Sequence, residues 1–262
     1  EIIIMDCNSI EFKTINYLKN LKLLKQENLI FKVINFSGKF NYSTVNNIAA
    51  KAAKGNILLF LNNDTEFTSY GWDEIMITHS SRPDIGFVGP KLIYENNKIQ
   101  HAGVVLGIGG AAGHSHKYFD LDKKGYKNKL VINQEVSAVT GACMAIKKEA
   151  WNNIGGFDEI SFPISYNDVD VCLRANLIGL RNIFLANLVV IHKESLTRGV
   201  PLGEEYKNWK KEYKNLRKYW GKLLENDPNY SPYLSLDRED YSLSERSHEN
   251  IYARKNQVNN NK

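Results

Sequence analysis

Carboxylates at the ends of apolar runs are the first feature of this sequence that could do chemistry. Asp64 directly follows the apolar run Ile57–Leu61, so it stands where a strand of an open α/β sheet would end. Ligands bind at that edge of such sheets. A carboxylate there can hold Mg²⁺ or Mn²⁺, the hard cations that neutralise a diphosphate. An ordinary polar turn would give the same pattern, because Asn and Asp are favoured in turns.

A second acidic pair stands before an amphipathic segment. Asp168 and Asp170 precede Val171 and Leu173 in the order Asn-Asp-Val-Asp-Val-Cys-Leu. One of the two carboxylates could act as a general base that takes a proton from a hydroxyl. The commoner reading is that both acids complement the dipole at the start of a helix. The pair alone leaves both readings open.

Two further strand-end residues carry groups suited to a nucleotide ligand. His192 ends the apolar run 183–191 and is followed by Lys193 and Arg198. An imidazole beside two cations suits a metal–diphosphate unit, although a strand-end histidine is more often structural. Asp6 ends the first apolar run and could either accept hydrogen bonds from a nucleotide base or cap the helix that follows.

The elements that must position these residues alternate along the chain. The short and wholly apolar run Ile57–Leu61 is typical of strands covered by helices on both faces. The predicted fold class is therefore α/β, with a mixed and mainly parallel sheet flanked by helices. The glycine-rich stretch 103–113 is predicted to be a loop. Helices are predicted at 11–26, 42–54, 168–177 and 203–225, and strands at 2–5, 29–34, 57–61, 86–94, 104–107 and 183–191.

The last predicted helix has its aromatic residues on one face. We expect this face to pack on the core and not to bind membrane, because acidic residues interrupt the basic side of the helix. The residues spaced for this face are Tyr206, Trp209, Tyr213, Leu216, Tyr219 and Trp220.

Composition places the chain among ordinary globular proteins. Of its 262 residues 43% are hydrophobic and 24% charged, which fits one large domain. The net charge of +5 is compatible with anionic substrates or with loose contact to acidic lipid headgroups, and is too small to indicate nucleic acid. No apolar run reaches membrane-spanning length, and the three cysteines form no C-x-x-C pair. We therefore expect a cytoplasmic protein, with peripheral contact at the inner face of the membrane compatible with its charge.

Four segments together resemble family 2 of the inverting glycosyltransferases, which have the GT-A fold. They are Glu1–Ser9, Asn41–Glu66 with its Leu-Asn-Asn-Asp-Thr, Thr140–Met144 with Gly155–Glu159, and Asn167–Arg174. The continuations His192–Gly199 and Asp227–Pro232 resemble a rhamnosyltransferase-like subgroup that builds O-antigen and other surface polysaccharides. The resemblance covers about residues 1–240.

The resemblance implies an arrangement of parts and a role for each candidate residue. A GT-A domain at 1–203 would have a nucleotide-sugar half at about 1–95 and an acceptor half at about 96–203, followed by a helical extension at 204–249 and a polar tail or linker at 250–262. Asp168 would be the catalytic base, and Asp64 and His192 would hold the metal. Donor contacts would come from Asp6, Asn47, Asn62, Asn63 and Arg198, and acceptor contacts from Gly156, Phe157, Asp158, Glu159 and Asn167.

The implied reaction moves a sugar from a UDP- or dTDP-sugar to a glycan or lipid-linked saccharide, with Mn²⁺ or Mg²⁺ as cofactor. The Gln-x-x-Arg-Trp signature of processive synthases is absent, so we expect one transfer per encounter. The family's first strand, which a helix separates from the strand at Glu1, has no counterpart here, and we expect it upstream in a longer polypeptide.

Two alternatives remain from other classes. A non-catalytic module that binds nucleotide sugar or carbohydrate is favoured by that missing strand and by Asn62 and Asn167, where many members are acidic. The presence of both Asp64 and Asp168 favours an enzyme instead. A nucleotidyltransferase would need a glycine-rich basic loop after the first strand, and none follows Asp6.

Overall fold

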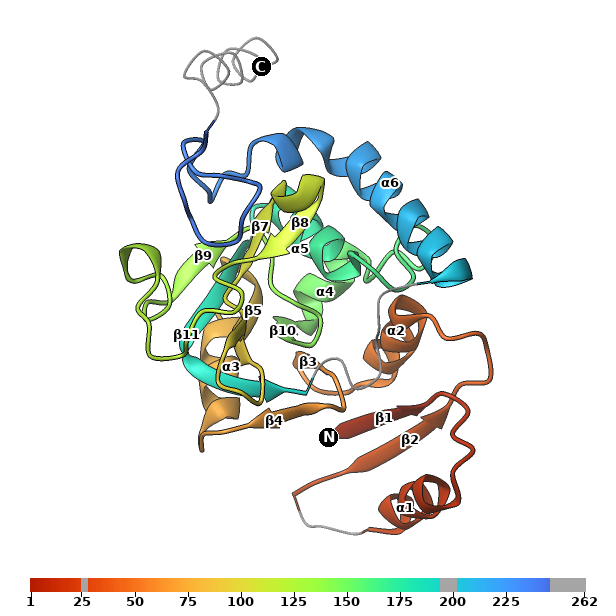
Figure 1. Cartoon of the computed structure of the whole chain (residues 1–262). Helices are drawn as coiled ribbons and strands as arrows, with labels where there is room; N and C mark the ends of the chain where they lie inside the picture. Colours follow the sequence, from red (N-terminus) through yellow and green to blue (C-terminus); the bar gives the residue numbers. More distant parts are fainter. Residues whose placement is uncertain (25–27, 194–201, 246–262) are drawn as a thin grey trace.

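The computed structural model describes residues 1–24, 28–193 and 202–245 (Figure 1). Strands and helices alternate along the first half of the chain, and the long helix α6 follows the last strand of the sheet. In chain order the elements are β1 (Ile2–Asp6), α1 (Phe12–Leu23), β2 (Phe31–Asn35), α2 (Tyr42–Ala52), β3 (Ile57–Leu61), β4 (Thr65–Phe67), α3 (Trp72–Ser80), β5 (Ile85–Ile93), β6 (Ile99–His101), β7 (Val104–Leu106), the 3₁₀ turn η1 (Ile108–Gly110), β8 (Ala112–His114), the 3₁₀ turn η2 (Tyr126–Asn128), β9 (Gln134–Val136), β10 (Cys143–Lys147), α4 (Lys148–Ile154), α5 (Asn167–Leu177), β11 (Arg181–His192) and α6 (Gly203–Glu225).

The strands of the described residues form one large sheet and two small ones. The seven-stranded sheet has the order β3-β10-β5-β11-β4, with β6 beside β5 and β9 beside β11. Strands β1 and β2 pair with each other, and with α1 they lie to one side of the large sheet (Figure 1). Strands β7 and β8 form a hairpin. The expected mixed α/β fold is confirmed, but the expectation of a mainly parallel sheet is wrong: the apolar run of β3, for example, pairs antiparallel with β10. Parallel pairing is confined to β1–β2 and β5–β11, and the other strand pairs are antiparallel.

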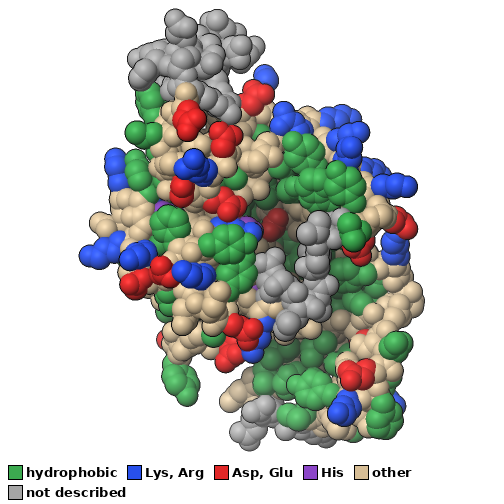
Figure 2. Space-filling view, in the orientation of Figure 1, with side chains coloured by type: hydrophobic (Ala, Val, Ile, Leu, Met, Phe, Trp, Pro, Cys, Tyr) green, Lys and Arg blue, Asp and Glu red, His purple; other side chains and the backbone are tan. Residues whose placement is uncertain are grey.

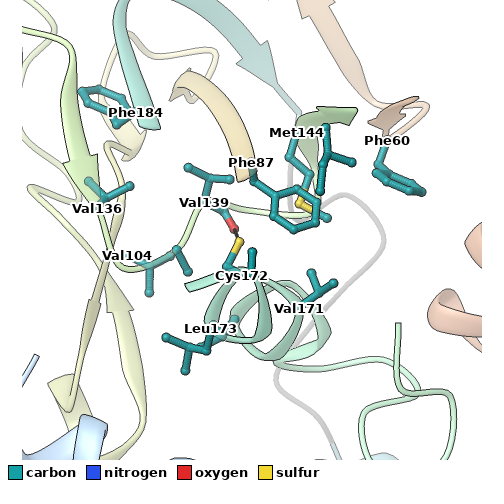
Figure 3. Packing of buried hydrophobic residues seen from close by; sticks show 14 of the residues in the cluster. Phe60, Phe87, Val104, Val136, Val139, Met144, Val171, Cys172, Leu173 and Phe184 are labelled. Carbon is teal, nitrogen blue, oxygen red and sulfur yellow. Dashed lines mark hydrogen bonds between the residues drawn. The ribbon is translucent and has the colours of Figure 1, made fainter. Parts of the chain in front are cut away.

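Strand β5 is the centre of the fold, and all nine of its residues are buried. Successive side chains of a strand point to opposite faces, so its neighbours Phe87 and Val88 join different hydrophobic clusters. Val88 packs in the cluster that includes Met76 of α3. Phe87 packs in the larger cluster with Val171 and Cys172 of α5 (Figure 3). Helices therefore cover both faces of the sheet, as the apolar strands indicate.

The C-terminal part of the described chain is tied into this core. Leu216, Trp220 and Leu224 of α6 belong to the larger cluster. Beyond the helix, the buried Asp227 accepts hydrogen bonds from the backbone N–H of Leu106, at 2.7 Å, and from the Ser137 hydroxyl. The carboxylate thus joins the tail to strand β7 and to the segment that leads into β10.

Most predicted elements are present with shifts of one to three residues at their ends. Helix α3 and strand β10 were not predicted, nor was α4. The two helices span only nine and seven residues, which is too short for a helical spacing of apolar residues to stand out in the sequence. The predicted loop at 103–113 instead holds β7, η1 and part of β8.

Candidate active site

The first part of the site is an edge of the large sheet, where two elements bring Asp64 and His192 together. Asp64 stands between β3 and β4, and β4 pairs antiparallel with the end of β11, where His192 lies opposite Thr65. The backbone N–H of Lys193 donates to the Asp64 carbonyl at 2.9 Å. This pairing holds His192 Nε2 3.1 Å from Asp64 Oδ1. The sheet thus builds the predicted metal pair.

The tautomer of a neutral His192 ring follows from its other nitrogen. Nδ1 lies 2.7 Å from the amide oxygen of Gln100, which can only accept a hydrogen bond. Nδ1 therefore carries the hydrogen, and in the neutral ring Nε2 keeps a lone pair. Nε2 and Asp64 Oδ1 then face each other as two acceptors, and this buried carboxylate oxygen has no hydrogen-bond partner.

A cation could bind between these two facing acceptor atoms, Nε2 of His192 and Oδ1 of Asp64. Adjacent ligands around an octahedral ion with bonds of about 2.1 Å lie about 3 Å apart, close to the Nε2–Oδ1 separation. Within 1–24, 28–193 and 202–245, no group of three or more His, Cys, Asp or Glu side chains could hold a metal. A divalent ion here would take its other ligands from water and phosphate oxygens, as Mg²⁺ commonly does. The residues therefore fit a hard divalent ion that arrives with an anionic ligand.

The second part of the site is Asp168, in the first turn of α5. Its Oδ2 accepts the backbone N–H of Gly141 at 2.9 Å, and its Oδ1 accepts the N–H of Val169 at 2.8 Å. The side chain is partly buried, and burial raises its pKa above the ordinary aspartate value, although these hydrogen bonds oppose the shift. The result is a carboxylate of fixed position and increased basicity.

Strand β10 connects Asp168 to the metal pair. The Tyr42 hydroxyl donates to the Gly141 carbonyl at 2.6 Å, which fixes the residue that binds Asp168. The next residue, Ala142, accepts the backbone N–H of Asn62 at 2.9 Å. From Asn62 the chain reaches Asp64 two residues later. The segments that carry the two candidate carboxylates, Asp168 and Asp64, are therefore linked by the backbone hydrogen bond between Asn62 and Ala142.

Asp170, the second acid of the motif, has a structural role. Its Oδ1 accepts the indole N–H of Trp220 at 2.9 Å, and its Oδ2 accepts from Arg174 at 2.9 Å. Burial raises its pKa, opposed by Arg174 and the indole. Asp170 is only 3% exposed and is ion-paired with Arg174, so it fastens α6 to α5, whereas the partly exposed Asp168 remains the candidate base.

The predicted donor-side residues are spread over several elements: Asp6 ends β1, Asn47 lies on α2, and Asn62 and Asn63 follow β3. Asp6 Oδ1 accepts the Ser9 N–H at 3.0 Å, and this hydrogen bonding lowers its pKa. The amide of Asn62 lies 3.5 Å from His192 Nε2, whereas Asn63 is exposed. Arg198 lies outside the described residues. Asn47 uses its Nδ2 group on Phe157 O and Glu159 Oε1, so the amide braces the neighbouring loop.

The predicted acceptor loop 155–159 is held together internally. Gly156 has φ +75°, and a Cβ there would meet Asn47 Oδ1 at 2.8 Å, so only glycine fits. Phe157 is buried between aromatic rings. Asp158 caps the following turn through Ile160 and Ser161. Glu159 accepts from Thr44 Oγ1 at 2.8 Å and from Asn47, and Asn167 donates to Ile164 O. These side chains shape the loop, and direct contact with an acceptor stays a prediction.

Sequence reasoning missed two groups near these carboxylates. Gln100, buried on β6, sets the His192 tautomer, and its only signal is a polar residue inside an apolar segment. Tyr166 directly precedes α5, and its side chain interacts with that of Trp209 on α6. Burial raises the pKa of Tyr166 to about 12, so its hydroxyl stays protonated at neutral pH.

A comparison with protein families assigns the chain. The model described as "Glycosyl transferase family 2" matches residues 1–155, which is more than half of the chain. This chain belongs to glycosyl transferase family 2. The match contains Asp6, Asn47 and Asp64 and ends before the Asp168 segment.

Curated relatives extend the likeness beyond residue 155. The family 2 chain is 34% identical over 245 residues to the "Uncharacterized protein y4gI" of Sinorhizobium fredii (strain NBRC 101917 / NGR234), with 93% of this chain and 27% of that protein covered. It is 37% identical over 207 residues to the "O-antigen biosynthesis protein RfbC" of Myxococcus xanthus, with 78% and 16% covered. The chain thus spans about a quarter or less of the length of these two relatives.

Solved structures share the GT-A fold with this family 2 chain. GalNAc-T7 with UDP, GalNAc and Mn²⁺ superposes with a TM-score of 0.63 at 16% identity, over 98% of this chain and 48% of that one. The mannosyltransferase PcManGT from Pyrobaculum calidifontis, in complex with GDP-Man and Mn²⁺, gives 0.56 at 14% identity, over 88% and 56%. No helix in the described part of the chain is both long and apolar enough to span a bilayer.

Proposed function

We propose that this chain is the catalytic domain of an inverting, metal-dependent glycosyltransferase. It moves one sugar per encounter from a UDP- or dTDP-sugar to a glycan or lipid-linked saccharide, in the synthesis of a surface polysaccharide. The family supports sugar transfer, and the likeness to RfbC supports the polysaccharide role. The Mn²⁺ and nucleotide named for the two similar structures support a divalent ion and a nucleotide-sugar donor.

The observation that carries the proposal is the fixed carboxylate of Asp168 beside the Asp64–His192 pair. With both oxygens positioned by backbone N–H groups, Asp168 can accept the proton of an acceptor hydroxyl. As that proton leaves, the hydroxyl oxygen bonds to the anomeric carbon from the face opposite the diphosphate. The carbon–oxygen bond to the diphosphate breaks, so the configuration inverts and the nucleotide diphosphate departs.

The donor side rests on Asp64 and His192, which would hold Mn²⁺ or Mg²⁺ through the two facing acceptor atoms. When bound, such an ion supplies the positive charge that stabilises a departing diphosphate. In this proposal Asp6 contacts the nucleotide base at the end of β1, and Asn62, Asn63 and Arg198 contact the donor. Asn47, Asn167 and the loop 155–159 act by shaping the acceptor side.

The test separates an enzyme from a module that only binds. UDP- and dTDP-sugars are incubated with the protein and Mn²⁺, with EDTA as control, and both the thermal shift and the released nucleotide are measured. A ligand at 100 times its dissociation constant adds about 2.7 kcal/mol of stability. We expect a shift and nucleotide release, both lost in EDTA. A shift without release would favour the binding module, and no shift with any donor would overturn the proposal.

A further inference from the structure

One face of α6 changes its surroundings halfway along the helix. The residues of this face recur at intervals of three and four, the spacing of a single helical stripe. In the C-terminal half Leu216, Trp220 and Leu224 are buried in the core. In the N-terminal half Tyr206 is 47% exposed, and Trp209 and Tyr213 are only partly buried. The stripe runs along the whole helix, but the core fully covers only its C-terminal half.

The three aromatic residues of the N-terminal half form a ladder, here called the aromatic ladder (Tyr206, Trp209 and Tyr213). Successive ring centroids lie 5.8 Å and 5.6 Å apart with interplanar angles of 27° and 32°. The stacked pair Phe67–Trp72 lies at 3.8 Å, so the rings of the ladder are offset and do not cover one another's faces. The helix therefore presents a row of inclined, offset rings, of which Tyr206 is the most exposed and Tyr213 also packs against the core.

The aromatic ladder is fixed to the segment that carries the candidate base. The Trp209 side chain interacts with that of Tyr166, which stands at the N-cap position of α5, two residues before Asp168. One turn along α6, the carboxylate of Glu212 accepts the backbone N–H groups of Ile164 and Ser165, at 3.0 Å and 2.6 Å. Figure 2 shows hydrophobic side chains over α6 along the rim of a hollow in this face, with an acidic side chain (red) visible inside it.

We propose that the aromatic ladder is a binding subsite for the saccharide acceptor, which would lie along α6 with its reacting hydroxyl directed to Asp168. This inference rests on the proposed function. The apolar face of a sugar ring stacks on an aromatic ring, and its hydroxyls then reach the polar tips of Tyr and Trp. Offset rings in a row offer platforms to successive sugar units of a chain. A lipid chain would instead need an aliphatic surface, whereas all three residues of the ladder have polar tips.

The experiment measures saccharide binding separately from donor binding. Saturation-transfer NMR is recorded on the full chain with Mn²⁺, UDP and a panel of free di- and trisaccharides of glucose, galactose, rhamnose and N-acetylglucosamine. We expect at least one member to bind, and Trp209→Ala and Tyr206→Ala to weaken it by about tenfold each. Tyr17→Ala is the control, since Tyr17 is 62% exposed on α1 and belongs to no part of the site.

Trp209→Phe keeps an aromatic ring but loses the indole N–H, so retained saccharide binding by this variant would assign the effect to stacking. The melting temperature of the variant shows whether α6 stays docked on the core. No binding by the wild type, or equal loss in Tyr17→Ala, would overturn the subsite. Binding of phosphatidylglycerol vesicles that disappears in Trp209→Ala would overturn it in favour of a membrane. A Mn²⁺–UDP thermal shift without saccharide binding would leave the proposed function standing and reject the subsite. Saccharide binding without that shift would support the subsite and reject the proposed function.

Discussion

The two ends of the active site are built in opposite ways. At the base end, the carboxylate of Asp168 receives backbone N–H groups on both oxygens, so its bonds within the protein are already made. At the metal edge, formed by Asp64, His192 and Gln100, a lone pair faces a carboxylate oxygen that has no hydrogen-bond partner. The difference teaches that the candidate base is positioned in advance, whereas the proposed metal edge would be completed only by a bound ligand.

The largest expected effect comes from removing the base without changing its shape. Asp168→Asn cannot accept the acceptor proton, so single-turnover transfer should fall by about 10²–10⁴-fold. Donor affinity should change little, because Asp64 and His192 are untouched. Near-normal transfer by Asp168→Asn, with donor binding measured in parallel, would move the base to another carboxylate and break the comparison.

Asp64→Ala should abolish the Mn²⁺-dependent part of nucleotide binding and leave the fold intact. The loss should exceed about 100-fold in metal affinity, the upper range for residues that act only through a ligand. Calorimetric titration of UDP or dTDP with and without Mn²⁺ measures it. Unchanged Mn²⁺ dependence would show that the two facing acceptors are not the metal site.

Gln100→Leu should have a smaller effect at the same edge. Without the amide oxygen, Nδ1 of His192 loses this hydrogen-bond acceptor, and the ring is free to change tautomer or turn. We expect metal affinity to fall by about 10–100-fold. Gln100→Glu is the matched control, because a carboxylate oxygen also accepts from Nδ1. Equal loss in both variants would assign the effect to packing.

The smallest predicted effect is a displacement of the pH profile. The raised pKa of Asp168 means that transfer should decline on acidification at a higher pH than for an ordinary aspartate, whose pKa is 3.8. The pH dependence of folding stability has the opposite sign. A carboxyl with a raised folded pKa contributes stability that is complete below the unfolded pKa and is lost as pH rises through the folded pKa. A rate profile at saturating donor, recorded beside a melting curve at each pH, checks both signs.

The sequence predicts the base end and part of the metal edge. Asp64, His192 and Asp168 were found because they follow or begin regular elements, and element ends are what hydrophobic periodicity locates. Gln100 was missed because its role depends on β6 lying beside β5, a long-range pairing that leaves no local pattern. The family resemblance supplied the role of the metal and of the base, which spacing alone left open.

The loop 155–159 and α6 show a different limit. Motif likeness gave an acceptor role to Phe157 and Glu159, but burial and hydrogen bonds to α2 and its neighbours occupy these side chains. On α6, periodicity predicted one aromatic face packed on the core. The C-terminal half does pack there, whereas the N-terminal half is only partly covered. A helical stripe shows which residues share a face but not how far the partner surface extends.

The buried carboxylate of Asp227 has a consequence for how the chain is made. Leu106, whose N–H binds Asp227, is 121 residues earlier in the chain. At ordinary rates of synthesis it is therefore made roughly 6–24 s before Asp227. During that interval the nascent β7–β8 hairpin lacks both this hydrogen bond and the α6 side chains that complete the core. Asp227→Ala should therefore lower the yield of soluble protein synthesised at 37 °C more than that of purified protein refolded slowly in the cold. Equal yields by both routes would show that the late contact is not a vulnerable step of biogenesis.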